Sequence, residues 1–383
     1  MYPREAVRAG IFIPPHHPID EDPTLAIQRD LELIEWYDRL GYQEAWVGEH
    51  HSGGYEIISS PEIFIAAAAE RTRRIMLGTG VVSLPYHHPL IVADRILQLD
   101  HQTRGRVMFG IGPGALNSDA VMMGIKTETQ RARMQESIEI ILRLFAGEVI
   151  THESDWFTLR EARMQLRPYT YPRPHVAVAS AVTPFGAVLA GRHGLGMLCV
   201  AASSPAGYDV LDTNWAAANK EAEKHGRTMN RADLRLVAPF HIAESREKAM
   251  DNVSWGWEKH AKYNRVLAPM GGGLIASSLE ELMERKSGVI GTPDDAVAYL
   301  ERYWEKTGGF GCILHLAINW PRFEDVKRSA ELFARYVMPK FAGRNDWRDA
   351  SFGWITEHSQ EFAGARKSAA NQAIEAYFGK KAG

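Results

Sequence analysis

Cysteine is scarce in this chain of 383 residues, which limits the chemistry that it can carry out. The only two cysteines are Cys199 and Cys312, and each lies within a short apolar run. Such positions predict buried thiols in strands. Two isolated cysteines of this kind provide neither a disulfide framework nor a thiolate metal site.

Long apolar runs and blocks of one charge sign are also missing. No stretch of about 18 uncharged apolar residues could span a membrane, and the first ten residues, MYPREAVRAG, lack the apolar centre of a secretory signal. Charged residues make up 24% of the chain, the formal net charge is -3, and no basic stripe suits nucleic acid. We therefore expect a cytoplasmic protein that binds neither membranes nor nucleic acid.

Short apolar runs alternate with amphipathic segments along most of the chain, a pattern typical of βα units around a parallel sheet. Eight runs are candidate strands. They span residues 7–13, 44–48, 75–84, 107–112, 175–181, 196–201, 234–243 and 312–318. Eight strand–helix alternations favour a (β/α)8 TIM barrel over an open sheet.

Proline and glycine mark where the helices between these strands begin and end. Residues 22–23, 60–61, 183–184 and 292–293 each place a capping side chain before proline, and Gly41, Gly147 and Gly308 supply stops. We expect one barrel domain over residues 1–342, with a hairpin-like excursion at 148–174. A flexible loop around a Pro-Met-Gly-Gly-Gly run is expected at 261–288, either as a lid or as a disordered insert, and a partly helical extension at 343–383.

Three His-His pairs, at 16–17, 50–51 and 87–88, raise the question of a metal site. Metal-dependent barrel hydrolases usually place two ligands on one face of a strand with HxH spacing, and no HxH occurs in this chain. We therefore expect no metal and set aside the metal hydrolase.

Chemistry in a TIM barrel gathers at the carboxyl ends of the strands, so the residues that follow each strand are the candidates. Glu49-His50-His51 follows the second strand, where one imidazole can face the pocket and move a proton. The segment 180–184 leads from the fifth strand into a helix whose free N–H groups favour an anion, and Arg131 can add positive charge. The GIGPGA run at 110–115 reads equally well as a tight turn or as a ligand contact.

Together, several motifs resemble the bacterial-luciferase-like flavin monooxygenases. They are EHH after the second strand, LGTG in the third, HP before the third helix, the LD-x-x-T-x-GR-x-x-FGIG approach to the fourth strand, and VIGTPDDAV near residue 292. The resemblance covers residues 7–340. Within the family, the IAAAAERT, SLPYHHPL and GRVMFG-x-GPGAL runs are most similar to enzymes of the limonene 1,2-monooxygenase type.

The resemblance implies a two-component enzyme. A separate NAD(P)H flavin reductase would supply reduced FMN, with FAD as a larger alternative. Dioxygen would form a hydroperoxide at flavin C4a and pass one oxygen atom to a small apolar substrate, such as a terpene alkene. Members of the family are commonly homodimers. Two reactions on the same barrel stay open as alternatives: Baeyer–Villiger oxidation of a cyclic ketone and F420-dependent oxidoreduction. A non-enzymatic flavin-binding barrel is less favoured, because such relatives lack the full set of loops.

The resemblance also assigns residues. His50 matches the active-site histidine, and Gly80-Val81 matches a dipeptide with a non-prolyl cis bond beneath the flavin ring. The other cofactor positions are Asp119 near the pyrimidine edge and Arg131, Ser180, Ala181 and Thr183 around the phosphate. For the apolar pocket wall we expect Phe12, Met108 and Trp257.

The departures from luciferase itself are informative. Gly112 stands where luciferase has a reactive cysteine, Pro113 where it has an arginine, and Ala179 where it has a glutamate. The first change argues against light emission from an aldehyde. The other two remove polar contacts near the phosphate, so Arg131 is expected to carry more of that binding.

Overall fold

Eight parallel strands close into a barrel in the computed structural model, which describes residues 3–267 and 276–379. Hydrogen-bonded neighbours follow the order β3-β2-β1-β13-β10-β9-β8-β5, and a pairing between β3 and β5 closes the ring. The strands are β1 (Arg8–Ile13), β2 (Glu44–Val47), β3 (Met76–Thr79), β5 (Val107–Gly112), β8 (His175–Ser180), β9 (Gly196–Cys199), β10 (Leu234–Ala238) and β13 (Cys312–Leu316). The predicted TIM barrel is confirmed.

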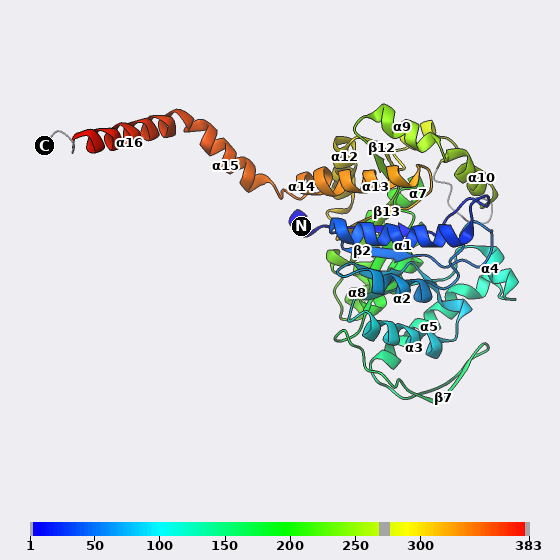
Figure 1. The fold of residues 1–383 in the computed structure, drawn as a ribbon. Helices are drawn as coiled ribbons and strands as arrows, with labels where there is room; N and C mark the ends of the chain where they lie inside the picture. The colour runs from blue at the N-terminus through cyan, green and yellow to red at the C-terminus, as the bar shows by residue number, and fades with distance from the viewer. Residues whose placement is uncertain (1–2, 268–275, 380–383) are drawn as a thin grey trace.

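Helices surround this barrel on its outer side (Figure 1). The main ones are α1 (Pro23–Leu40), α2 (Pro61–Arg71), α3 (Pro89–Gln102), α5 (Gln130–Phe145), α6 (Phe185–His193), α8 (Leu211–Lys224), α12 (Pro293–Thr307) and α13 (Phe323–Leu332). Short helices α4 (Asn117–Met122) and α7 (Pro205–Asp209) follow strands β5 and β9. Larger insertions add α9 (Arg246–Ser254), α10 (Trp257–Leu267) and α11 (Leu279–Glu284).

The predicted helix signals are partly confirmed. Asp22 accepts a hydrogen bond from the Leu25 backbone at the start of α1, and Thr292 forms a full capping box at the start of α12. At the other two predicted starts the side chain does not cap the helix, although α2 begins at Pro61 as predicted. The Ser60 hydroxyl donates to the Glu62 carboxylate instead of capping α2, and α6 starts only at Phe185, two residues after Thr183.

Two of the expected strands are interrupted. The third is divided by a cis peptide bond between Gly80 and Val81, after which β4 (Val82–Ser83) continues along β5. The seventh ends at Ala238, where Pro239 has no N–H to donate to the ladder. The chain then forms β11 (Phe240–Ile242), which pairs with β12 (Val289–Gly291) outside the barrel.

The excursion at 148–174 contains a hairpin as predicted, formed by antiparallel β6 (Ile150–Glu153) and β7 (Thr158–Ala162). The described parts of the stretch 261–288 contain helix, because residues up to 267 belong to α10 and Ser278 caps α11. The central glycine run at 271–273 lies outside the described residues.

The barrel interior is filled by side chains, as an eight-stranded barrel requires. Its apolar members are Phe12, Trp46, Met108, Ala177, Leu198, Val237, Cys312 and Leu314. At the amino-terminal end the Glu44 carboxylate accepts hydrogen bonds from Arg235 and Arg8. Met108 is the second residue of β5, and its sulfur lies 4.0 Å from the Arg235 guanidinium. Our assignment of Met108 to the substrate pocket is therefore wrong, since it packs at the end of the barrel opposite the carboxyl ends of the strands.

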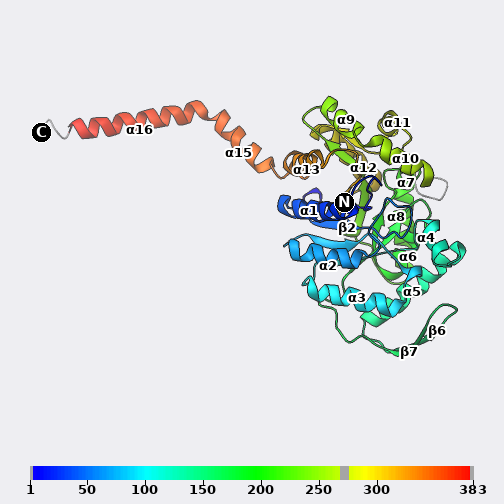
Figure 2. The same ribbon diagram turned by 45° about the vertical axis from the view of Figure 1, so that its right-hand side comes forward.

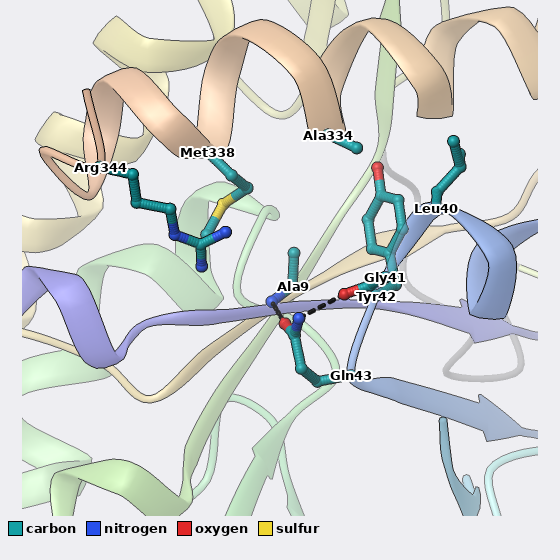
Figure 3. A pocket seen from close by; sticks show the side chains of 8 residues that line it. All are labelled: Ala9, Leu40, Gly41, Tyr42, Gln43, Ala334, Met338 and Arg344. Carbon is teal, nitrogen blue, oxygen red and sulfur yellow. Dashed lines mark hydrogen bonds between the residues drawn. The ribbon is translucent and has the colours of Figure 1, made fainter. Parts of the chain in front are cut away.

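A small pocket also opens at the amino-terminal end (Figure 3), with a volume of about 40 Å³. Gln43 spans it, accepting a hydrogen bond from the Ala9 backbone at 2.9 Å and donating to the Gly41 carbonyl. TIM-barrel chemistry sits at the opposite end, so we regard this pocket as structural.

The C-terminal extension leaves the barrel after α14 (Met338–Phe341) as two helices, α15 (Asp346–Glu357) and α16 (Ser359–Gly379). Both views show them projecting away from the barrel (Figures 1 and 2). Neither helix has a buried residue, and Trp347 is 91% exposed. Among the helices that the structure describes, none has the length and apolarity to cross a membrane.

Candidate active site

His50 lies at the carboxyl end of β2, in the loop that leads to α2, and carboxylates flank both sides of its ring. Its Nε2 is 2.6 Å from a Glu56 oxygen, and its Nδ1 is 3.3 Å from an Asp119 oxygen. Burial lowers the pKa of His50, but the charge of Glu56 and the hydrogen bond to Asp119 outweigh it and raise the pKa to about 10. At neutral pH the ring is therefore a cation with a proton on each nitrogen.

Asp119 belongs to α4, yet it holds the loop after β2. One of its oxygens accepts hydrogen bonds from the Ser52 hydroxyl and the His51 backbone, and the other faces His50. Burial raises the pKa of this carboxyl, but the hydrogen bonds from His50 and Ser52 bring it below the usual value. An ionised Asp119 thus ties α4 to the strand end that carries His50.

His51 points to a different set of partners, as expected for adjacent residues in extended backbone. Its Nε2 and the Nε2 of His87 each lie 2.8 Å from the same oxygen of the buried Glu49 carboxylate. The other Glu49 oxygen accepts the Ser83 backbone N–H in β4. These three side chains come within metal-ligand range of one another, and their mutual hydrogen bonds explain that closeness without an ion.

The cis Gly80–Val81 bond directly follows β3, at the carboxyl end of that strand. A Cβ on Gly80 would lie 2.9 Å from the Phe12 ring, which places Phe12 against this segment. A Cβ on Gly112 would lie 2.5 Å from the Val81 side chain, so the cysteine that luciferase has at this position would not fit unless Val81 moved.

The segment after β8 is open, as an anion site requires. Residues 181–184 are exposed, and Thr183 shares a cavity of about 360 Å³ with Arg131, Gln135 and Arg192. The Arg131 guanidinium lies 5.6 Å from the centre of the Phe185 ring. Ser180 is buried, and its hydroxyl has no partner among the described residues. The structure thus brings Arg131 and Thr183 together, beside the start of α6.

Trp257 is buried on α10, which lies with α4 and α7 at one end of the barrel (Figure 2). Its ring packs against Trp320 at 5.2 Å and His260 at 6.0 Å between centroids. An apolar cluster of α9, α10 and α11 surrounds it. Trp257 therefore forms part of an aromatic wall over the carboxyl end of β13.

Residues 7–309 match the family model described as luciferase-like monooxygenase. The chain belongs to the luciferase-like monooxygenase family. It is 46% identical to 4-hydroxyprotoasukamycin monooxygenase of Streptomyces nodosus subsp. asukaensis, over 93% of this chain and 98% of that protein. It is 45% identical to limonene 1,2-monooxygenase of Rhodococcus erythropolis, over 87% of this chain and 86% of that protein.

Solved structures of luciferase-like proteins share the fold. A monooxygenase from Streptomyces bottropensis superposes with a TM-score of 0.78 at 28% identity, covering 88% of this chain and all of that one. The FMN complex of the oxygenating constituent of 3,6-diketocamphane monooxygenase from Pseudomonas putida gives 0.76 at 23% identity, over 87% and 98% of the two chains. F420-dependent enzymes also occur among the weaker matches.

Several residues around His50 and His51 have little or no signal in the sequence. Glu49 is marked only by the EHH motif, and His87 only by its place in one of three histidine pairs. Glu56 gave no signal, because it follows a polar loop with no periodicity. Only the fold shows that Glu56 and Asp119, 63 positions apart in the sequence, face the same imidazole.

Proposed function

We propose that the chain is the oxygenase component of a two-component system that uses reduced FMN from a separate NAD(P)H flavin reductase. It would insert one atom of dioxygen into a small, largely apolar substrate, with a terpene alkene as the first candidate. One observation carries the proposal: the carboxyl ends of the strands combine a cavity lined by Arg131 and Thr183 with a histidine ring that lies between two carboxylates.

The residues present fit the phosphate of FMN. The Ser180 hydroxyl is buried without a partner in the described part of the chain, which costs free energy unless a ligand pairs with it. The exposed segment 181–184 leads into α6, whose first backbone N–H groups suit an anion. Arg131 would supply the positive charge, and Thr183 a further hydroxyl.

Bound reduced flavin would supply the electrons that activate dioxygen. The protein's own contribution is to hold a proton and to exclude water. His50 keeps its proton throughout the neutral range, fixed by Glu56 and Asp119. A proton held at this position favours oxygen transfer to an electron-rich alkene, whereas Baeyer–Villiger attack on a ketone needs a deprotonated oxidant. Phe12 and Trp257 form apolar surfaces that keep the site dry.

The phosphate assignment is tested with Arg131→Ala. The dissociation constants of reduced FMN and reduced riboflavin, which lacks the phosphate, are measured anaerobically by titration. Loss of a charge-assisted hydrogen bond should weaken FMN binding by about 10- to 100-fold and leave riboflavin binding unchanged. Arg143→Ala, at the exposed far end of the same helix, serves as the control. Unchanged FMN affinity in Arg131→Ala would overturn the assignment.

The F420 alternative makes a different prediction. An F420-dependent oxidoreductase would reduce F420 with an alcohol under anaerobic conditions and would form no oxygen-dependent product. We expect no F420 reduction by this chain, and spectrophotometry at the F420 absorption band checks it.

A further inference from the structure

Three buried ring side chains near the carboxyl ends of β1 and β13 have polar atoms without partners. They are His16, in the loop after β1, His260 on α10, and Trp320, in the loop after β13. The unpaired atoms, within the part of the chain that the structure describes, are both ring nitrogens of His16, Nδ1 of His260 and Nε1 of Trp320. We call these three residues the imidazole–indole cluster.

The three rings form a continuous group. The centroid of His260 lies 5.1 Å from that of His16 and 5.3 Å from that of Trp320. The relative exposures of the residues are 4% for His16, 6% for His260 and 2% for Trp320. These polar atoms are therefore shielded from bulk solvent. Buried polar groups in proteins are nearly always paired, so several unpaired ones in one place point to a bound ligand or an ordered water.

The cluster is electrically neutral and rich in donors. Burial is the main reason why the pKa of His16 falls to about 4 and the pKa of His260 falls well below its ordinary value. Both rings are therefore uncharged at neutral pH. The Asn264 side-chain amide donates to His260 Nε2 and also to the His260 carbonyl, which fixes its orientation. His260 therefore carries its proton on Nδ1 and presents a free N–H, as does the Trp320 indole.

The cluster is connected to the proposed active site. The Tyr263 ring contacts His16 at 4.9 Å and stacks on Tyr55 at 4.5 Å between centroids. Burial, and then the charge of Glu56, the partner of His50, raise the pKa of the Tyr263 hydroxyl. A molecule held at the imidazole–indole cluster would therefore lie within one side-chain layer of the His50 site.

We propose that the imidazole–indole cluster binds a carbonyl oxygen of the substrate, so that the substrate is an alkene that also carries a ketone. A carbonyl only accepts hydrogen bonds, and it matches the free N–H groups of His260 and Trp320. A neutral cluster has no charge to attract a carboxylate or a phosphate. This proposal rests on the proposed oxygenase function, because it names the class of substrate for that site.

The test compares limonene with carvone, which has the same carbon skeleton but a ketone in place of one ring methylene. Dissociation constants are measured anaerobically by calorimetry on the full chain with reduced FMN, so that no turnover occurs. Carvone is expected to bind about 10-fold more tightly than limonene, the effect of one or two added hydrogen bonds. Equal binding of the two would overturn the proposal.

Two variants locate the interaction. His260→Phe and Trp320→Phe each keep an aromatic ring and remove an N–H donor, and each should reduce the preference for carvone to about twofold or less, the loss of a typical hydrogen bond. Trp255→Phe, at a tryptophan that is 49% exposed, is the control and should keep the preference. A preference that survives in both cluster variants would overturn the proposal.

Failure of the carbonyl-binding proposal and failure of the proposed oxygenase function give different results. If carvone binds preferentially but neither compound is oxygenated when oxygen is admitted, the oxygenase function fails and the carbonyl site stands. If both compounds are oxygenated and bind equally, the oxygenase function stands and the carbonyl site fails.

Discussion

The charge of His50 depends on Glu56, and removing that carboxylate is the most informative perturbation of the site. In Glu56→Gln the amide keeps the size of the side chain and removes its negative charge. In the wild type, His50 Nε2 lies 2.6 Å from a Glu56 carboxylate oxygen. In the variant this nitrogen would face a neutral amide, while Asp119 would remain on the other side of the ring.

The expected size of the effect follows from the two flanking charges. An opposite charge at this range shifts a pKa by about 1 to 3, so the pKa of His50 should fall from about 10 to about 7 to 9. The pKa of His50 in the folded state is above the ordinary value of 6.5, so protonation of its ring stabilises the folded state. This stabilisation is complete below pH 6.5. That stabilisation is lost as pH rises toward 10. The melting temperature of the wild type should therefore fall across this range, and in Glu56→Gln the fall should end at lower pH.

The assay is a pH titration of the imidazole by long-range ¹H–¹⁵N NMR, with the pH profile of kcat/KM beside it. The wild-type profile should show no histidine step between pH 6 and 9, and Glu56→Gln should gain a falling limb within that range. Glu56→Asp keeps the charge and should stay close to wild type. A wild-type His50 that titrates near 6.5, or an unchanged pKa in Glu56→Gln, would refute the reasoning.

Three further predictions concern the scaffold. Glu44→Gln should lose about 3–5 kcal/mol of the free energy of unfolding in urea, because Arg235 would stay buried without its partner; a loss below about 1 kcal/mol would contradict this. In the wild type, burial raises the pKa of Glu44, but the charges of Arg235 and Arg8 outweigh it and bring the pKa to about 2. The stabilisation from this carboxylate is therefore complete above pH 4.5 and lost as pH falls toward 2. A chain that ends at Asn345 should keep its melting temperature and activity, since α15 and α16 bury none of their residues; a lower melting temperature would show that they support the barrel. Gly110→Ala should destabilise the barrel by about 1–3 kcal/mol in the same urea assay, because the new Cβ would meet the Thr79 carbonyl oxygen at 2.0 Å, and unchanged stability would be evidence against that clash.

The alternation of apolar runs predicted the barrel because each strand in a closed parallel sheet is buried on both faces. It did not predict where strands break. Pro239 lies inside an apolar run, and the period of the pattern is the same on both sides of it. The Pro239 break became clear only from the pairing of β11 with β12.

The candidate site shows the same limit. The positions of His50, Arg131 and Thr183 near the carboxyl ends of the strands could be predicted, because each follows a strand or lies at the start of a helix there; their roles stay predictions. Met108 was misplaced because an apolar residue inside a strand gives no sign of its height along the barrel axis. The sequence gives no signal for Trp320 or His260, because only the fold places their polar atoms together, without partners among the described residues.

The central claim is that this chain, supplied with reduced flavin, oxygenates an organic substrate. The most direct measurement is mass spectrometry of the products formed under ¹⁸O₂ from purified chain, FMN, NADH and a general flavin reductase, with a panel of alkenes and ketones. We predict a product that contains one ¹⁸O atom and depends on both the chain and the reductase. Products that take their oxygen from water, or no oxygenated product from any member of the panel, would contradict the account.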